Sequence, residues 1–129
     1  MRDIQLYYEA VNELLGDLVK EGSFAEELRN ALNEDRSETA SLRMKTLYQL
    51  QLHMARDRLE RLLSIKPPKE AKAIHGAYFA AFEMGVEARQ QALDGNYFEA
   101  SAAYDVSSKG LTRANSMWDK LGVERYPEP

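Results

Sequence analysis

Apolar residues recur along the first quarter of the chain in alternating steps of three and four, which is the period of one face of an α-helix. The series keeps its phase past Gly22 and is interrupted only by Glu21; its members are Ile4, Tyr7, Val11, Leu14, Leu18, Ala25, Leu28 and Leu32. We therefore predict one helix over about residues 3–34, which could be kinked near Gly22. The alternative is two shorter helices, because a glycine followed by Ser23 and Glu26 has the pattern of a helix stop and a capping box.

Three further helices are predicted, over about residues 38–65, 68–93 and 97–121. Asp35 and Ser37 are both good N-caps for the first of them. It must end before Pro67, since the residue that precedes a proline avoids helical dihedral angles. Gly95 separates the last two helices, and Gly122 ends the fourth.

Small residues form a stripe on each of the last two helices. They are Ala77, Ala81, Gly85, Ala88 and Ala92 on one helix, and Ala100, Ala103, Ser107, Gly110 and Ala114 on the other. In an antiparallel hairpin that turns near Gly95, Gly85 is level with residues 103–107 and Ala81 is level with Gly110. The two backbones can then approach to the short end of the usual 8 to 10 Å range.

These elements predict an all-α fold, an antiparallel up-down-up-down bundle of four helices. With 129 residues the chain has the length of one domain. We expect that domain to cover residues 1–122 and residues 123–129 to form a loosely ordered C-terminal tail.

The net charge of -4 is unevenly distributed along the chain. Residues 1–35 hold three basic and nine acidic residues, a net charge of -6, whereas residues 36–66 hold seven basic and three acidic residues, a net charge of +4. The first helix should therefore lie beside the second and attract it. The alternative is that the basic residues of the second segment form a patch for nucleic acid or anionic lipid, but such binding usually needs a more basic domain.

Several classes of function lack their sequence signals. The chain has no cysteine, and neither His53 nor His75 follows a glutamate by three residues, as di-metal sites in helical bundles require. Phosphate-binding and dinucleotide-binding fingerprints are absent, and so is a nucleophile elbow. We expect no enzyme, no metal, no cofactor and no nucleic acid partner. No apolar run approaches the ~20 residues of a membrane span, so the cytoplasm is the default compartment unless an export leader has been trimmed.

A few polar residues fall within the predicted apolar faces and are the candidates for a site. Gln51 and Arg58 lie in the apolar arc of the second helix, and Arg89 lies in that of the third. His75 borders an apolar sector and should be level with Arg58 across the proline turn. Arg58, His75 and Arg89 are therefore the candidate positions of a polar ligand site or a buried polar network. His53 lies at the centre of a polar face, where we expect it to be solvated.

The apolar arcs of the four helices are wider than one lean bundle needs. This favours a non-enzymatic protein-interaction or structural module that could use the surplus to form a homodimer. The alternative is a small-ligand bundle whose apolar cavity receives polar groups from the three candidate residues. Met44, Met54, Met84 and Met117 lie on apolar stripes, and we expect them to fill the core.

Overall fold

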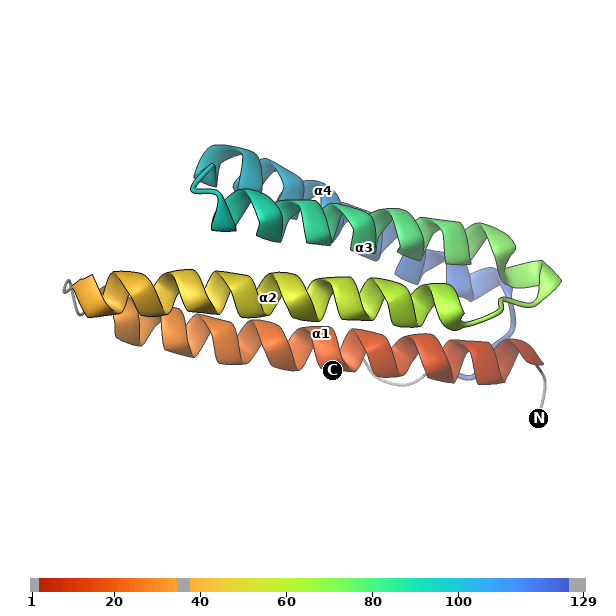
Figure 1. Cartoon of the computed structure of the whole chain (residues 1–129). Coiled ribbons are helices and arrows are strands. Elements are labelled where there is room, and N and C mark those ends of the chain that lie inside the picture. The colour runs from red at the N-terminus through yellow and green to blue at the C-terminus, as the bar shows by residue number, and fades with distance from the viewer. Residues whose placement is uncertain (1–2, 35–37, 126–129) are drawn as a thin grey trace.

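The computed structural model describes residues 3–34 and 38–125, apart from the side chains of residues 24, 31–34 and 38–40. It contains four helices: α1 (Asp3–Glu34), α2 (Glu38–Ser64), α3 (Lys72–Leu93) and α4 (Tyr97–Ser116). Within the described residues there is no strand (Figure 1). The predicted all-α fold class is confirmed.

The helix bounds follow the predicted ones closely, with two local differences. After the two prolines, residues Lys69–Ala71 form one 3-10 turn before α3, and the amide of Ala71 donates to the carbonyl of Pro68. Residues Met117–Lys120 form another 3-10 turn after α4. Both turns satisfy terminal backbone groups in the tighter pattern that helix ends commonly adopt. The candidate N-caps Asp35 and Ser37 lie outside the described residues.

Helix α1 is continuous through Gly22, so the interpretation as two shorter helices is wrong. Gly22 is exposed, but Glu21 just before it and Ala25 just after it are both buried. Burial on both sides of the glycine keeps one face of the helix in contact with the bundle. Packing of that face outweighs the helix-stop signal, because most helical stability in proteins comes from tertiary contacts.

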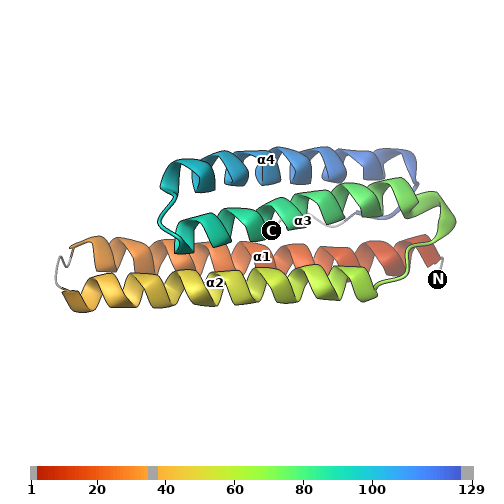
Figure 2. The same cartoon turned by 45° about the horizontal axis from the view of Figure 1, so that its top comes forward.

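Helices next to each other in the sequence lie side by side, and the chain turns back at the end of each helix (Figure 1). Figures 1 and 2 both show that α1 and α2 extend beyond the turn that joins α3 to α4. At that turn Gly95 has a φ of 82°, and the amide of Asn96 donates to the carbonyl of Gln91. This is a Schellman motif, which requires a left-handed residue that glycine adopts without strain. Phe98, which follows this turn, is 85% exposed.

Helices α3 and α4 pack closely, as their small residues predict. A Cβ atom added to Gly110 would lie 3.1 Å from the Cβ of Ala81. One added to Gly85 would lie 3.4 Å from the Oγ of Ser107. The predicted register of this hairpin is therefore confirmed, with Ala81 level with Gly110 and Gly85 level with Ser107.

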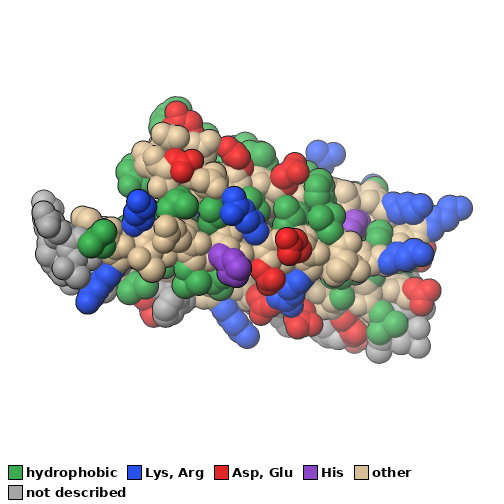
Figure 3. Space-filling view, in the orientation of Figure 1, with side chains coloured by type: hydrophobic (Ala, Val, Ile, Leu, Met, Phe, Trp, Pro, Cys, Tyr) green, Lys and Arg blue, Asp and Glu red, His purple; other side chains and the backbone are tan. Residues whose placement is uncertain are grey.

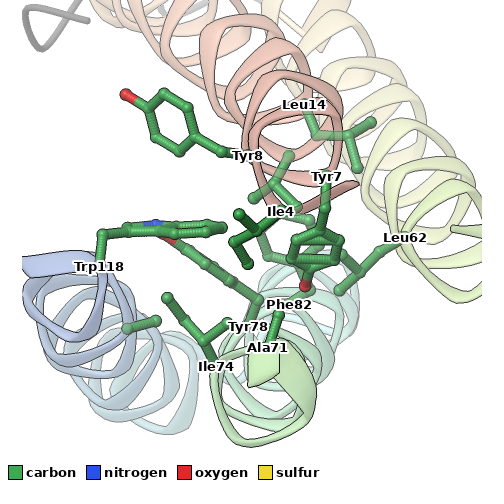
Figure 4. Packing of buried hydrophobic residues seen from close by; sticks show 12 residues of the cluster. Ile4, Tyr7, Tyr8, Leu14, Leu62, Ala71, Ile74, Tyr78, Phe82 and Trp118 are labelled. Carbon is green, nitrogen blue, oxygen red and sulfur yellow. The ribbon is translucent and has the colours of Figure 1, made fainter. Parts of the chain in front are cut away.

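The apolar core occupies the half of the bundle that contains the start of α1. Figure 4 shows Trp118 between the ring of Tyr8 and the side chains of α3. The Trp118 ring is 4.9 Å from the Tyr8 ring and 5.7 Å from the Tyr7 ring, measured between centroids. Its Nε1 donates to the hydroxyl of Tyr78 over 2.7 Å. Trp118 therefore connects the C-terminal end of the hairpin to α1.

The part of the predicted tail that the structure describes is held against α1. The side-chain amide of Gln5 donates to the carbonyl of Glu124 and accepts from the amide of the same residue. Val123 packs against the apolar core. The rest of the predicted tail, residues 126–129, lies outside the described residues.

Tyr78 makes the core sensitive to alkaline pH. Burial raises the pKa of Tyr78 to about 12, whereas an unfolded tyrosine ionises near pH 10. The stabilisation that comes from the neutral Tyr78 in the folded state is thus complete below pH 10. It is lost as the pH rises from 10 to 12. We expect Tyr78 to account for a loss of up to about 2–3 kcal/mol, in addition to that from Tyr7, whose pKa burial also raises; urea unfolding followed by circular dichroism measures the total.

Two variants test this expectation. Tyr78→Phe should be less stable at neutral pH, because Trp118 loses its acceptor, but should lose less stability between pH 10 and 12 than the natural protein. Tyr97→Phe, which changes an exposed ring, should leave the pH dependence as it is. Equal slopes for Tyr78→Phe and the natural protein would contradict the assignment.

Candidate functional site

Three charged side chains from three helices meet inside the bundle. Glu21 of α1 forms an ion pair with Arg58 of α2 through Oε2, and the Nε of Arg89 of α3 lies 3.4 Å from its Oε1. The residues are 5%, 5% and 9% exposed, respectively. Charged residues are almost never buried this deeply unless they are paired. We call Glu21, Arg58 and Arg89 the charged cluster.

Neighbouring residues of α3 and α4 hold Arg89 in place. Its Nη1 donates to the carbonyl of Gly85 over 2.9 Å. Its Cζ lies 5.4 Å from the centroid of the Tyr104 ring, within the range of a cation–π contact. Ser107 donates to the carbonyl of Ala81, one turn before Gly85 in α3. All four helices therefore contribute to the surroundings of the cluster.

The predicted pairing of an acidic first helix with a basic second helix is present in side-chain contacts. Glu21 pairs with Arg58 in the interior, and Asp17 pairs with Arg61 at the surface, where Nη1 and Oδ2 are 3.2 Å apart. Burial lowers the pKa of the Arg58 guanidinium, and the Glu21 carboxylate opposes that shift. The interior pair thus offsets part of the cost of removing the guanidinium from water.

The three residues predicted as site candidates do not lie together. Arg58 and Arg89 meet at Glu21, whereas His75 lies beside Tyr7, whose hydroxyl is 2.7 Å from the histidine Nδ1. Glu21 and Tyr7 are fourteen residues apart on α1, or about 21 Å at 1.5 Å per residue. Burial lowers the pKa of His75 and raises that of Tyr7, so both groups are neutral at pH 7. His53 is exposed, as its polar face predicts.

Glu21 is the member of the cluster that sequence reasoning missed. It was visible as the one polar residue in the apolar series of α1, opposite a helix whose apolar arc contains an arginine. Gln51, the other polar residue in that arc, is also buried, and within the described chain its Oε1 has no hydrogen-bond partner.

The interior next to the charged cluster has little free space. One cavity of about 20 Å³ lies there, bordered by Arg58, Arg89 and Ser107 among apolar side chains. A cavity needs roughly 10–15 Å³ to hold one water molecule. The cavity therefore has room for about one water molecule. It is much smaller than an ordinary small-molecule pocket of 300–1,000 Å³. This small cavity does not fit the ligand of the small-ligand hypothesis, but Glu21 and Arg58 also border an open groove of about 550 Å³ together with Asp17, His53 and Arg61.

The solvent-facing side of the seam between α3 and α4 carries an apolar groove of about 370 Å³. Each helix contributes a stripe with steps of four, three and four: Ala73, Ala77, Ala80 and Met84 on α3, and Val106, Gly110, Arg113 and Met117 on α4. We call these eight residues the outer face. All four methionines that were expected to fill the core are partly buried, and Met117 also packs against the apolar core, so that expectation is met only in part.

The rest of the described surface carries mixed charges and further grooves. Figure 3 shows Lys and Arg side chains spread along one side of the molecule with Asp and Glu among them. One of the further grooves, of about 170 Å³, lies between α1 and α4 beside Trp118. Among the described residues, no group of three acidic or histidine side chains is placed to hold a metal ion. Nor does any described helix have the length and apolarity to cross a bilayer.

Comparison with protein-family models, with curated proteins and with solved structures finds no match. The charged cluster and the outer face are therefore features of the structure that bear on function.

Proposed function

We propose that this protein is a non-enzymatic, self-associating module whose outer face packs against the outer face of a second copy. The observation that carries the proposal is the composition of that face, in which seven of eight residues are uncharged and Val106 is 52% exposed. A helical hairpin with an apolar stripe on both helices has the pattern of half a four-helix interface.

The residue types of the outer face suit close contact between helices. Alanine and glycine allow two helix backbones to approach each other. Met84 and Met117 supply flexible apolar side chains that adapt to an opposing surface. The groove runs along the seam between α3 and α4, which matches a helical surface better than a compact ligand.

The charges on α4 favour a second copy as the partner. Glu99 and Arg113 lie seven residues before and after Val106, on the same side of the helix. A two-fold axis at Val106, with the two α4 helices antiparallel, places Glu99 of each copy opposite Arg113 of the other. In a symmetric interface each such contact occurs twice. Among the described residues, neither Glu99 nor Arg113 forms an ion pair within its own chain.

Val106→Glu tests the apolar contact. We expect the natural protein to have twice the monomer mass by light scattering. The dissociation constant of the variant dimer should be at least tenfold higher, because two carboxylates would be buried near the axis. The variant should keep its folding stability, since the position is half-exposed in one copy. Leu63→Glu, at a similarly exposed leucine of α2, is the matched control and should remain dimeric.

A charge exchange tests the partner and the register. Arg113→Glu should weaken the dimer because it places Glu99 opposite a second carboxylate, and Glu99→Arg should weaken it for the corresponding reason. The double variant should regain the natural association, since the pairs are restored with opposite polarity. A natural protein that stays monomeric at every concentration and salt would refute self-association; a dimer that the double variant fails to restore would refute the register alone.

A further inference from the structure

The groove between α1 and α4 has the size of a small aromatic molecule. The two helices have few backbone contacts with each other, and the groove between them measures about 170 Å³. Val11 and Leu15 of α1 and Leu111 of α4 form part of its apolar wall. The rings of Tyr8 and Trp118, which Figure 4 shows near each other, also border it. Since an apolar cavity of about 150 Å³ holds one benzene ring, this groove has room for a single aromatic ring.

One polar side chain at the groove is held in a fixed orientation. The Nε1 of Trp118 donates to the hydroxyl of Tyr78, and that hydroxyl donates to the Oδ1 of Asn115 over 2.5 Å. Because the oxygen of the Asn115 amide accepts this bond, the orientation of the amide is settled, and its nitrogen offers two N–H donors. Asn115 borders the groove. The groove therefore combines apolar walls with a preorganised hydrogen-bond donor.

The charge at the groove is positive. Among the described residues that border it, Arg125 is cationic and none is acidic. Arg125 pairs with Asp119 through Nη1, which leaves its other N–H groups available. Burial raises the pKa of Tyr78, and the charge of Arg125 opposes that rise. The guanidinium thus lies near enough to act on the hydroxyl that donates to Asn115, so the cation and the amide donor serve the same part of the groove.

We propose that this groove binds a small molecule that joins one aromatic ring to a carboxylate, of the chemical class of phenylacetate. The ring packs against the indole of Trp118 and the apolar side chains of both helices. The carboxylate accepts hydrogen bonds from the amide of Asn115 and the guanidinium of Arg125, and such charge-assisted bonds are about twice as strong as neutral ones.

This site is separate from the features described above. Arg58, His75 and Arg89, the candidates from the sequence, do not border the groove. The groove also shares no residue with the outer face, so the proposal does not depend on self-association. The monomeric variant Val106→Glu should bind the aromatic acid as the natural protein does.

Intrinsic fluorescence tests the proposal, because Trp118 is the one tryptophan of the chain. The full chain is titrated with phenylacetate, with benzyl alcohol, which has the ring without the carboxylate, and with acetate, which has the carboxylate without the ring. Phenylacetate should change the emission saturably, with half-saturation at or below about 1 mM. The other two compounds should bind at least about tenfold more weakly. No saturable change with phenylacetate, or equal binding of benzyl alcohol, would overturn the proposal.

A matched pair of variants assigns the effect to this groove. Asn115→Asp keeps an acceptor for the Tyr78 hydroxyl but replaces the amide donor by a carboxylate oxygen, so it should weaken phenylacetate binding at least about tenfold. Asn96→Asp makes the same change at an exposed position and should leave the affinity as it is. In NMR spectra of the natural protein, phenylacetate should shift the indole N–H of Trp118 and the side-chain amide of Asn115. Equal affinities of the two variants, or shifts confined to residues outside the groove, would overturn the assignment.

Discussion

Replacing Glu21 by glutamine is expected to lower the free energy of unfolding by about 3–5 kcal/mol, one of the two largest single-site effects we predict. The substitution keeps the shape of the side chain but removes its charge, which leaves Arg58 and Arg89 buried without a carboxylate. A domain is typically stable by only about 5–15 kcal/mol, so the variant should be close to unfolding at room temperature. Urea unfolding followed by circular dichroism measures the change.

A matched control lies one turn away on the same helix. Asp17→Asn removes a carboxylate that pairs with Arg61, but both side chains are more than 40% exposed, so the expected loss is below about 1 kcal/mol. Replacing the whole cluster by apolar residues, with leucine at Glu21 and methionine at Arg58 and Arg89, should recover most of the lost stability, since no buried charge then remains. Equal losses for Glu21→Gln and Asp17→Asn would show that burial of the cluster contributes nothing.

The fold could be predicted from the sequence because its signals agree with one another. The apolar period, the proline pair and the glycine turns mark the same boundaries, and the structure differs mainly where helix ends tighten into 3-10 turns. The break at Gly22 was the one point of conflict. The phase of the apolar series settled it, because burial of Glu21 and Ala25 continues the same face on both sides.

The candidate site was predicted only in part, for a physical reason. The sequence shows that Arg58 and Arg89 lie within apolar arcs, which implies buried partners. It does not give the distances between helices, which determine which residues those partners are. His75 was grouped with them because the proline turn was expected to place it beside Arg58. In the structure it is about 21 Å away along α3, estimated from fourteen residues at 1.5 Å each, and it contacts Tyr7 instead.

The outer face shows a second limit of sequence reasoning. An apolar stripe predicts burial without saying whether the same chain or another one covers it. Met84 and Met117 lie on such stripes and are partly exposed, because no other helix of the described residues covers the outer side of the α3–α4 seam. The surplus apolar surface inferred from the sequence thus corresponds to a definite face of the hairpin.

Replacing Trp118 by alanine is the other change with a large expected effect, a loss of about 3–5 kcal/mol. Trp118 is 2% exposed, packs against Tyr7 and Tyr8 of α1, and donates to the hydroxyl of Tyr78. Because α1 and α4 have few backbone contacts of their own, the indole is a main connection between them. Its removal leaves a cavity that extends the groove between α1 and α4. Because α4 then loses its connection to α1, backbone amides in the last turns of α4 should exchange with solvent faster than those of α2.

Two comparisons separate the packing of the indole from its hydrogen bond. Trp118→Phe keeps an aromatic ring and loses the N–H donor, so most of the stability should remain if packing dominates. Phe98→Ala removes an aromatic ring that is 85% exposed, and its effect should stay within about 0.5 kcal/mol. If Trp118→Ala and Phe98→Ala were to destabilise the protein equally, the ends of α1 and α4 would be joined by contacts other than the indole, and the aromatic cluster of Figure 4 would be an incidental part of the core.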